Sequence, residues 1–164
     1  YGNVFPEPHA FNYNAELVKV PALDGSGKMR KSENQSATLY LADDDDAIRK
    51  KIMKAKTVGV PAEKNSVMPD YIENIFGLMK LVSSKEKADK YEADFNNASI
   101  RYGDMKKELA EDMVSFIAPI RQKATDLLSD EKKLTQILEQ GAEKARKSAA
   151  ATMKEVRSAM GLIY

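Results

Sequence analysis

The residues with the clearest chemical potential form one short loop at 25–32, with the sequence GSGKMRKS. It places Lys28 and Lys31 three positions apart behind a Gly-Ser-Gly turn, whose glycines let the backbone approach a ligand closely. Lysine ammonium groups are compact, mobile charges, so the loop predicts polyphosphate binding. It is not a P-loop, because the G-x-x-x-x-G-K-[ST] spacing is not met. A solvated basic segment is the alternative interpretation of these residues taken alone.

The chain of 164 residues has an ordinary globular composition, with 43% apolar and 31% charged residues. Its formal net charge of +1 means that any nucleic-acid surface must be a local patch. The lack of cysteine excludes disulfides and thiolate metal sites, and the single histidine, His9, excludes a multi-histidine metal site. Because no apolar run approaches the roughly 20 residues that cross a bilayer, we expect a cytoplasmic protein with no membrane association.

The elements that must position the loop differ on its two sides. Residues 1–35 are rich in Pro, Gly, Asn and aromatic residues and contain one candidate strand at 17–21, whereas the pattern from residue 42 onward is almost wholly helical. Four aspartates at 43–46 begin a helix that ends in lysines near residue 56, as the helix dipole favours. Adjacent helical residues diverge, so we interpret the aspartates as a helix start and propose no metal ligands.

Two helices are expected next, followed by a longer one. Pro69 suits the first turn of one helix, and Ser83 is expected to cap the following helix, where Glu86 completes a Ser-x-x-Glu capping box. The longer helix, at 104–128, carries a continuous apolar stripe. Pro119 interrupts this helix, and we expect a kink and not two separate helices.

The C-terminal part is expected to form two helices divided by a glycine. Asp130 is expected to cap a short helix, and Gly141 to separate it from a last helix that ends near Met160, with Gly161 as its stop. Basic residues project from one side of this last helix. A solvated charged face and an RNA-contacting stripe both explain them.

The pentapeptide KMRKS at 28–32 resembles the KMSKS loop of class I aminoacyl-tRNA synthetases, and the rest of the chain is similar to bacterial-type tryptophanyl-tRNA synthetases. The supporting segments are IRKKIMKA at 48–55, YGDMKKELA at 102–110, APIR at 118–121 and VRSAMGL at 156–162. Arg30 departs from the family's serine. The resemblance implies a mainly α chain: a C-terminal helical bundle domain that binds the tRNA anticodon, 36–164, preceded by the last strand and KMSKS-type loop of a Rossmann-like α/β catalytic domain, 1–35.

The same resemblance implies a homodimeric tryptophan-tRNA ligase that uses ATP to convert L-tryptophan to tryptophanyl-adenylate and transfers it to tRNA(Trp). Lys31 and Lys28 are then the catalytic candidates, because charge placed near departing pyrophosphate in the transition state accelerates the reaction. The nucleotide-binding candidates are Lys28, Met29, Arg30, Lys31 and Ser32. Met29 is expected beside adenine with its backbone available, and Ser32 either contacts phosphate or caps the next turn with Gln35. Mg²⁺ would be held mainly by the ATP phosphates.

The tRNA-binding candidates are Lys106, Lys107, Arg121, Lys147, Lys154 and Arg157, chosen by charge and helical face. The chain lacks an initiator methionine and the His-x-Gly-His segment of class I enzymes, for which His9, followed by Ala and Phe, cannot substitute. We therefore expect a C-terminal fragment that cannot activate tryptophan alone. The alternatives are a tyrosyl-tRNA synthetase-like enzyme and a non-catalytic helical module that binds RNA or protein.

Overall fold

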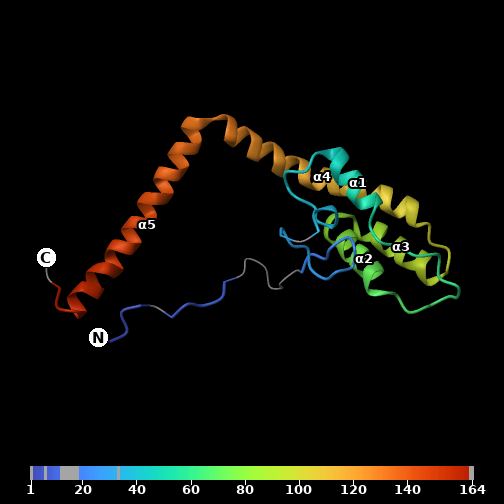
Figure 1. The fold of residues 1–164 in the computed structure, drawn as a ribbon, viewed down its shortest axis with the longest axis horizontal. Helices are drawn as coiled ribbons and strands as arrows, with labels where there is room; N and C mark the ends of the chain where they lie inside the picture. Colours follow the sequence, from blue (N-terminus) through green and yellow to red (C-terminus); the bar gives the residue numbers. More distant parts are fainter. Residues whose placement is uncertain (1, 6, 12–18, 33, 163–164) are drawn as a thin grey trace. The chain divides into compact units, whose positions relative to one another are not determined.

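The structure is a computed structural model that describes residues 2–5, 7–11, 19–32 and 34–162 (Figure 1). Contacts divide the chain into two compact units, one made of Tyr1–Leu17 with Ala124–Tyr164 and the other of Val18–Lys123. The helices are η1 (Gln35–Ala37), α1 (Asp45–Met53), α2 (Asp70–Val82), α3 (Lys85–Asn96), α4 (Tyr102–Ser129) and α5 (Glu131–Ala159). The predicted mainly α fold class is confirmed.

The strand expected at 17–21 lies partly outside the described residues, which omit 17 and 18, and the described remainder is not assigned as a strand. Pro21 instead forms an isolated antiparallel bridge with Lys28. The Met29 amide donates to the Val20 carbonyl at 2.8 Å beside this bridge. Proline has no amide hydrogen to extend a ladder, so the segment before the loop closes as a short hairpin-like turn.

Helix α1 begins as its charge pattern predicts. The Asp44 carboxylate caps it by accepting from the Ala47 amide at 2.7 Å, acidic residues occupy the first turn, and basic residues occupy the last. Ile48 and Ile52 are fully buried on its inner face. The predicted dipole-matched helix is therefore confirmed, with its apolar face against the core.

The cap predicted for α3 is wrong by one residue. Ser84, not Ser83, is the N-cap, and its hydroxyl accepts from the Lys87 amide at 3.4 Å. Ser83 still belongs to the end of α2, because its own amide donates to the Met79 carbonyl at 2.8 Å. Because the Ser83 backbone amide is already bonded to α2, Ser84 takes the N-cap position of α3.

Helix α4 is a single helix of 28 residues with Pro119 inside it, so the prediction of one helix and not two is confirmed. Its kink stays a prediction. The apolar stripe is buried only as far as Ile117, whereas Phe116 is 50% exposed and Ile120 is 39% exposed. The expected continuous stripe therefore packs on the core along its N-terminal part and faces solvent beyond it.

The break expected at Gly141 is wrong, because α5 runs through it as one helix of 29 residues. Glycine in a helix interior costs only about 1 kcal/mol relative to alanine, which a helix rich in Ala, Lys, Glu and Gln can tolerate. The two predicted ends are confirmed. The Asp130 carboxylate caps the start at the Lys133 amide, and Gly161, with φ of +71°, ends the helix in a Schellman motif.

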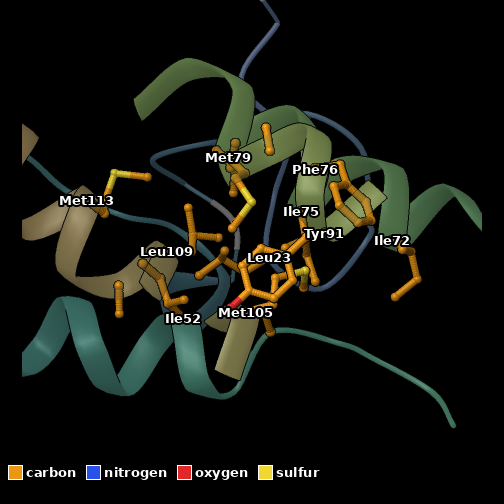
Figure 2. Close-up of a cluster of buried hydrophobic side chains, with 14 of the residues drawn as sticks. Leu23, Ile52, Ile72, Ile75, Phe76, Met79, Tyr91, Met105, Leu109 and Met113 are labelled. Carbon is orange, nitrogen blue, oxygen red and sulfur yellow. The ribbon is translucent and has the colours of Figure 1, made fainter. Parts of the chain in front are cut away.

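One apolar core lies within the Val18–Lys123 unit (Figure 2). Figure 2 shows Leu23, from the turn before the lysine loop, among side chains of the helices, including Ile52 of α1 and Leu109 of α4. Phe76 and Phe95 meet edge to face, with 6.4 Å between ring centroids. The turn that precedes the loop is thus anchored in the same core that joins α1 to α4.

None of the helices in the described part of the chain combines the length and the apolar character needed to span a membrane.

Candidate functional site

The turn that begins the lysine loop, residues 25–32, requires glycine at two positions. Gly25 and Gly27 have φ of +81° and +108°, values that residues with a Cβ rarely adopt. A Cβ on Gly25 would lie 2.8 Å from the Tyr71 Cβ, so the backbone approaches α2 closely there. The Ala22 amide donates to the Gly27 carbonyl at 2.8 Å and closes the turn. Both glycines therefore supply the backbone conformation of the turn, and Gly25 brings the base of the loop against α2.

A carboxylate links this turn to the far end of the loop. One Asp24 oxygen accepts from the Ser26 amide at 3.0 Å and from its hydroxyl at 2.6 Å, and the other accepts from the Asn34 side chain at 3.0 Å. The Ser26 hydrogen bonds hold the pKa of Asp24 below its usual 3.8. Asp24 is therefore ionised at neutral pH and ties the segments on either side of the lysines together.

Asn34, not Ser32, begins the turn after the loop. Its side-chain oxygen accepts from the Ser36 amide at 3.1 Å and caps the 3-10 helix Gln35–Ala37. The capping pattern expected for Ser32 and Gln35 is therefore wrong, because the helix begins three residues after Ser32 and takes its cap from the residue immediately before it. The phosphate contact of Ser32 stays a prediction.

Met29 faces the core between the two lysines. Its thioether sulfur accepts from the Leu39 amide at 3.1 Å, and the side chain packs against the apolar cluster. Its own amide already donates to the Val20 carbonyl at 2.8 Å. The expectation that the Met29 backbone is available for ligand contacts is wrong for the amide, and its place beside adenine stays a prediction.

The backbone of the basic segment is held by residues that follow it, while its basic side chains are exposed. The Thr38 hydroxyl donates to the Arg30 carbonyl at 3.0 Å, and the Tyr40 hydroxyl donates to the Lys31 carbonyl at 3.2 Å. Lys28 and Lys31 are both exposed. The arrangement can present two ammonium groups to an anionic ligand from an anchored backbone.

An apolar groove of about 540 Å³ lies beside the loop in the same unit. Met29, Lys31 and Tyr40 line it from the loop side, and Leu81 of α2 and Phe116 of α4 line it from the helices. Its lining is mainly hydrophobic, and Lys31 is the charged residue among those that line it.

Lys106 does not have the place expected of an RNA contact. It is only 8% exposed, and its ammonium group donates to the Ala55 carbonyl at 2.7 Å, to the Thr57 hydroxyl at 2.9 Å and to the Met53 carbonyl at 3.4 Å. Burial lowers the pKa of Lys106 below its usual 10.5. An ammonium group with three internal acceptors has no donor left for phosphate, so this prediction is corrected.

Arg121 is also occupied within the protein, whereas Lys107 is exposed on α4. The Arg121 guanidinium donates to the Asp43 carbonyl and to the Asp45 carboxylate, at the start of α1. These bonds hold α4 to α1 in the Val18–Lys123 unit. The RNA contact expected of Arg121 does not fit this pairing, and Lys107 stays a candidate.

The remaining candidates, Lys147, Lys154 and Arg157, are exposed on α5. Lys154 and Arg157 border a surface groove of about 650 Å³, whose lining also includes Met153 and Leu162. Lysine and arginine side chains in this lining suit phosphate contacts, and an arginine guanidinium can also stack on an unpaired base. Exposed cations suited to phosphate contacts therefore occur along α5.

The four aspartates at 43–46 have separate partners. They are Lys51 for Asp43, the Ala47 amide for Asp44, Arg121 for Asp45 and Arg49 for Asp46. Over the described ranges, no three acidic, histidine or cysteine side chains gather as a metal site. The aspartates thus begin and anchor α1.

Sequence reasoning missed the residues that support the loop. Asp24 two positions before Ser26 is a typical Asx-turn signal, and Asn34 is a good cap, so both had local signals. No local sequence signal marks Thr38 and Tyr40 as supports, because their hydroxyls donate to backbone carbonyls eight and nine residues earlier in the chain.

The sequence profile of the family described as tRNA synthetases class I (W and Y) matches residues 1–118. The chain is 49% identical over 157 residues to the tryptophan-tRNA ligase of Porphyromonas gingivalis, covering 96% of this chain and 47% of that protein. It is 38% identical over 170 residues to the tryptophan-tRNA ligase of Helicobacter pylori strain 26695, covering 99% of this chain and 49% of that protein. The chain spans about half the length of the curated relatives it matches.

Solved structures agree with these relatives. The tryptophanyl-tRNA synthetase of Campylobacter jejuni, complexed with ADP and tryptophan, superposes with a TM-score of 0.71 at 28% sequence identity, covering 91% of this chain and 45% of that one. The tryptophanyl-tRNA synthetase of Mycoplasma pneumoniae shares the fold, with a TM-score of 0.65 at 22% identity, covering 88% of this chain and 44% of that one.

Proposed function

Since the chain belongs to the class I tRNA synthetases for tryptophan and tyrosine, we propose that it is the part of a tryptophan-tRNA ligase that supplies the lysine loop and the RNA-binding helices. The complete enzyme would convert ATP and L-tryptophan to tryptophanyl-adenylate and pyrophosphate, then transfer the tryptophanyl group to tRNA(Trp). The observation that carries the proposal is the pair of exposed lysines, Lys28 and Lys31, on a backbone anchored from both sides. This chain alone would be inactive.

The loop serves the activation step. The tryptophan carboxylate attacks the α-phosphate of ATP, the bond from that phosphorus to the bridging oxygen breaks, and pyrophosphate leaves with the electron pair. Lys31 meets the charge that develops on the leaving group, and Lys28 shares it. Anchoring of the backbone at the Lys31 carbonyl lowers the reorganisation needed to place that ammonium group. Side-chain contacts by Arg30 and Ser32 would complete the phosphate site.

A magnesium ion would accompany ATP and depend mainly on phosphate oxygens for its ligands. When bound, the ion would neutralise phosphate charge, and the lysines would supply the positive charge that comes from the protein.

Residues 36–164 form the proposed RNA-binding domain, and residues 1–35 the end of the catalytic domain. This is a functional division, because the lysines serve the nucleotide and the helices serve tRNA. Lys107, Lys147, Lys154 and Arg157 remain the proposed tRNA contacts, since all four are exposed. We further propose that the complete enzyme is a cytoplasmic homodimer, as in the family it resembles.

Charge reversal on α5 tests the RNA-binding role. The double variant Lys147→Glu with Lys154→Glu should weaken tRNA(Trp) binding by about tenfold or more at fixed salt, because each lost phosphate contact reduces the electrostatic contribution. A filter-binding titration measures this, with Lys64→Glu, an exposed lysine on the 54–69 connection, as the control. Equal affinity in the double variant and the control would contradict the assignment.

A chimera tests the activity. The segment of the Porphyromonas gingivalis ligase that matches this chain is replaced by it, and tryptophan-dependent exchange of pyrophosphate into ATP is measured. We expect exchange by the chimera and none by this chain alone. A folded chimera without exchange would favour a non-catalytic helical module. The family also includes tyrosine enzymes, and stronger binding of tRNA(Tyr) than of tRNA(Trp) by this chain would favour a tyrosyl-tRNA synthetase-like enzyme.

A further inference from the structure

Lys106 is a buried cation whose contacts are directed at one short segment of chain. Its three acceptors, the Met53 and Ala55 carbonyls and the Thr57 hydroxyl, all lie at or just beyond the end of α1. Among the described residues, no carboxylate forms an ion pair with its ammonium group. Carbonyls at a helix C-terminus lack intrahelical donors and carry partial negative charge, so a buried cation can satisfy them. Lys106 therefore fixes the segment 53–57 to α4.

This segment is hydrogen-bonded to the base of the lysine loop. Lys56 lies between Ala55 and Thr57, whose oxygens are the two nearest to the Lys106 ammonium group. The Lys56 amide donates to the Leu23 carbonyl at 3.0 Å. The Leu23 amide donates in turn to the Ala37 carbonyl at 3.0 Å. Leu23 precedes the loop and Ala37 follows it, so both ends of the loop meet beside the residues that Lys106 holds. Figure 2 shows Leu23 in the same buried cluster as Met105, the neighbour of Lys106 on α4.

Other contacts hold α1 to α4 without Lys106. The Arg49 side chain donates to both carboxylate oxygens of Glu111 at 2.7 and 3.0 Å, and Arg121 binds Asp45 at the opposite end of α1. Removal of Lys106 would therefore release the end of α1 and the connection after it, while the rest of α1 stays docked.

We propose that Lys106 is a positioning residue for the lysine loop: it holds 55–57 so that the Lys56 amide fixes Leu23, and thereby the base from which Lys28 and Lys31 reach a polyphosphate. The catalytic part of this inference rests on the proposed ligase function, whereas the structural part does not. The residue acts through the backbone of the loop and does not itself contact the nucleotide.

Amide hydrogen exchange of the 164-residue chain tests the structural part. Lys106→Met keeps an unbranched apolar side chain and removes the ammonium group, and Lys123→Met, at an exposed lysine of the same helix, is the matched control. We expect about tenfold faster exchange at the Leu23 and Lys56 amides of Lys106→Met, because unsatisfied acceptors destabilise the local fold. Buried amides of α2 should change less than twofold, and the control should match the wild type.

Unchanged exchange at Leu23 and Lys56 in folded Lys106→Met would overturn the proposal. An equal loss of protection throughout the core would also overturn it, since Lys106 would then be a general stability residue. If Lys106→Met does not fold, Thr57→Val decides the question, because it removes one acceptor and leaves the lysine. Faster exchange at Lys56 in that variant supports the proposal, and wild-type exchange refutes it.

The chimera tests the catalytic part. Lys106→Met should lower the kcat of pyrophosphate exchange about tenfold and leave the KM for tryptophan within about twofold, because the loop is misplaced while the tryptophan site is intact. Lys123→Met should leave both unchanged. A chimera without any exchange contradicts the ligase function, but amide exchange still decides the role of Lys106. Equal kcat values for the two variants in an active chimera contradict the positioning role.

Discussion

Substitution of Gly25 by alanine tests whether the loop base packs against α2 as described. Alanine at the Gly25 φ of +81° costs about 1–2 kcal/mol, because its Cβ disfavours left-handed backbone. The new Cβ would also lie 2.8 Å from the Tyr71 Cβ, which is attached directly to the α2 backbone and cannot rotate away. Overpacking of this kind adds about 1–3 kcal/mol. We therefore expect Gly25→Ala to lower the free energy of unfolding by about 2–5 kcal/mol.

Urea denaturation measures this change. The chain has seven tyrosines and no tryptophan, so near-ultraviolet circular dichroism follows the packed tyrosines. Gly59→Ala is the control, because the φ of Gly59 lies outside the left-handed region and its Cβ position has open space around it. It should leave stability unchanged or raise it by up to about 1 kcal/mol. Equal stability of the two variants would refute the close packing of Gly25 on Tyr71.

Two further predictions concern the helices. Gly141→Ala should stabilise α5 by about 1 kcal/mol and raise the temperature at which this helix unfolds, since Gly141 lies inside one continuous helix. Circular dichroism during heating measures the change, and a less stable variant would favour the helix break predicted at Gly141. The Arg49 hydrogen bonds hold the pKa of Glu111 below its usual 4.5, so this carboxylate stabilises the fold above that pH and loses its contribution as the pH falls through the folded-state pKa. The stability difference between the wild type and Glu111→Gln should therefore shrink on acidification from pH 7 in urea titrations, and a difference independent of pH would contradict the pairing.

The helices were predictable because their signals are local. Asp44 and Asp130 cap helices that begin where the sequence predicted. The periodic apolar residues of α4 are mostly buried as far as Ile117, whereas Phe116 and Ile120 are exposed. Boundaries failed where two local solutions compete. Ser83 and Ser84 are both good caps, and only the use of the Ser83 amide by α2 distinguishes them. The helix break predicted at Gly141 was wrong because a glycine can end a helix or lie within it at a modest cost in free energy.

The candidate site was predictable in its reactive residues but not in its supports. Lys28 and Lys31 follow from spacing and resemblance, and the structure places both at the surface. The places of Lys106 and Arg121 depend on acceptors in α1 and its connection, at sequence distances of 49 residues or more. Charge and helical periodicity alone do not distinguish a cation that binds RNA from one that binds a helix end.

The proposed role of Lys31 is tested most directly by its substitution in the active chimera. Lys31→Ala should lower the kcat of tryptophan-dependent pyrophosphate exchange about 10²–10³-fold, with the KM for ATP changed much less, because the ammonium group acts mainly in the transition state. Lys64→Ala, at an exposed lysine outside the loop, should leave kcat unchanged. An unchanged kcat in Lys31→Ala, or a loss confined to KM, would contradict a role for this loop in pyrophosphate departure.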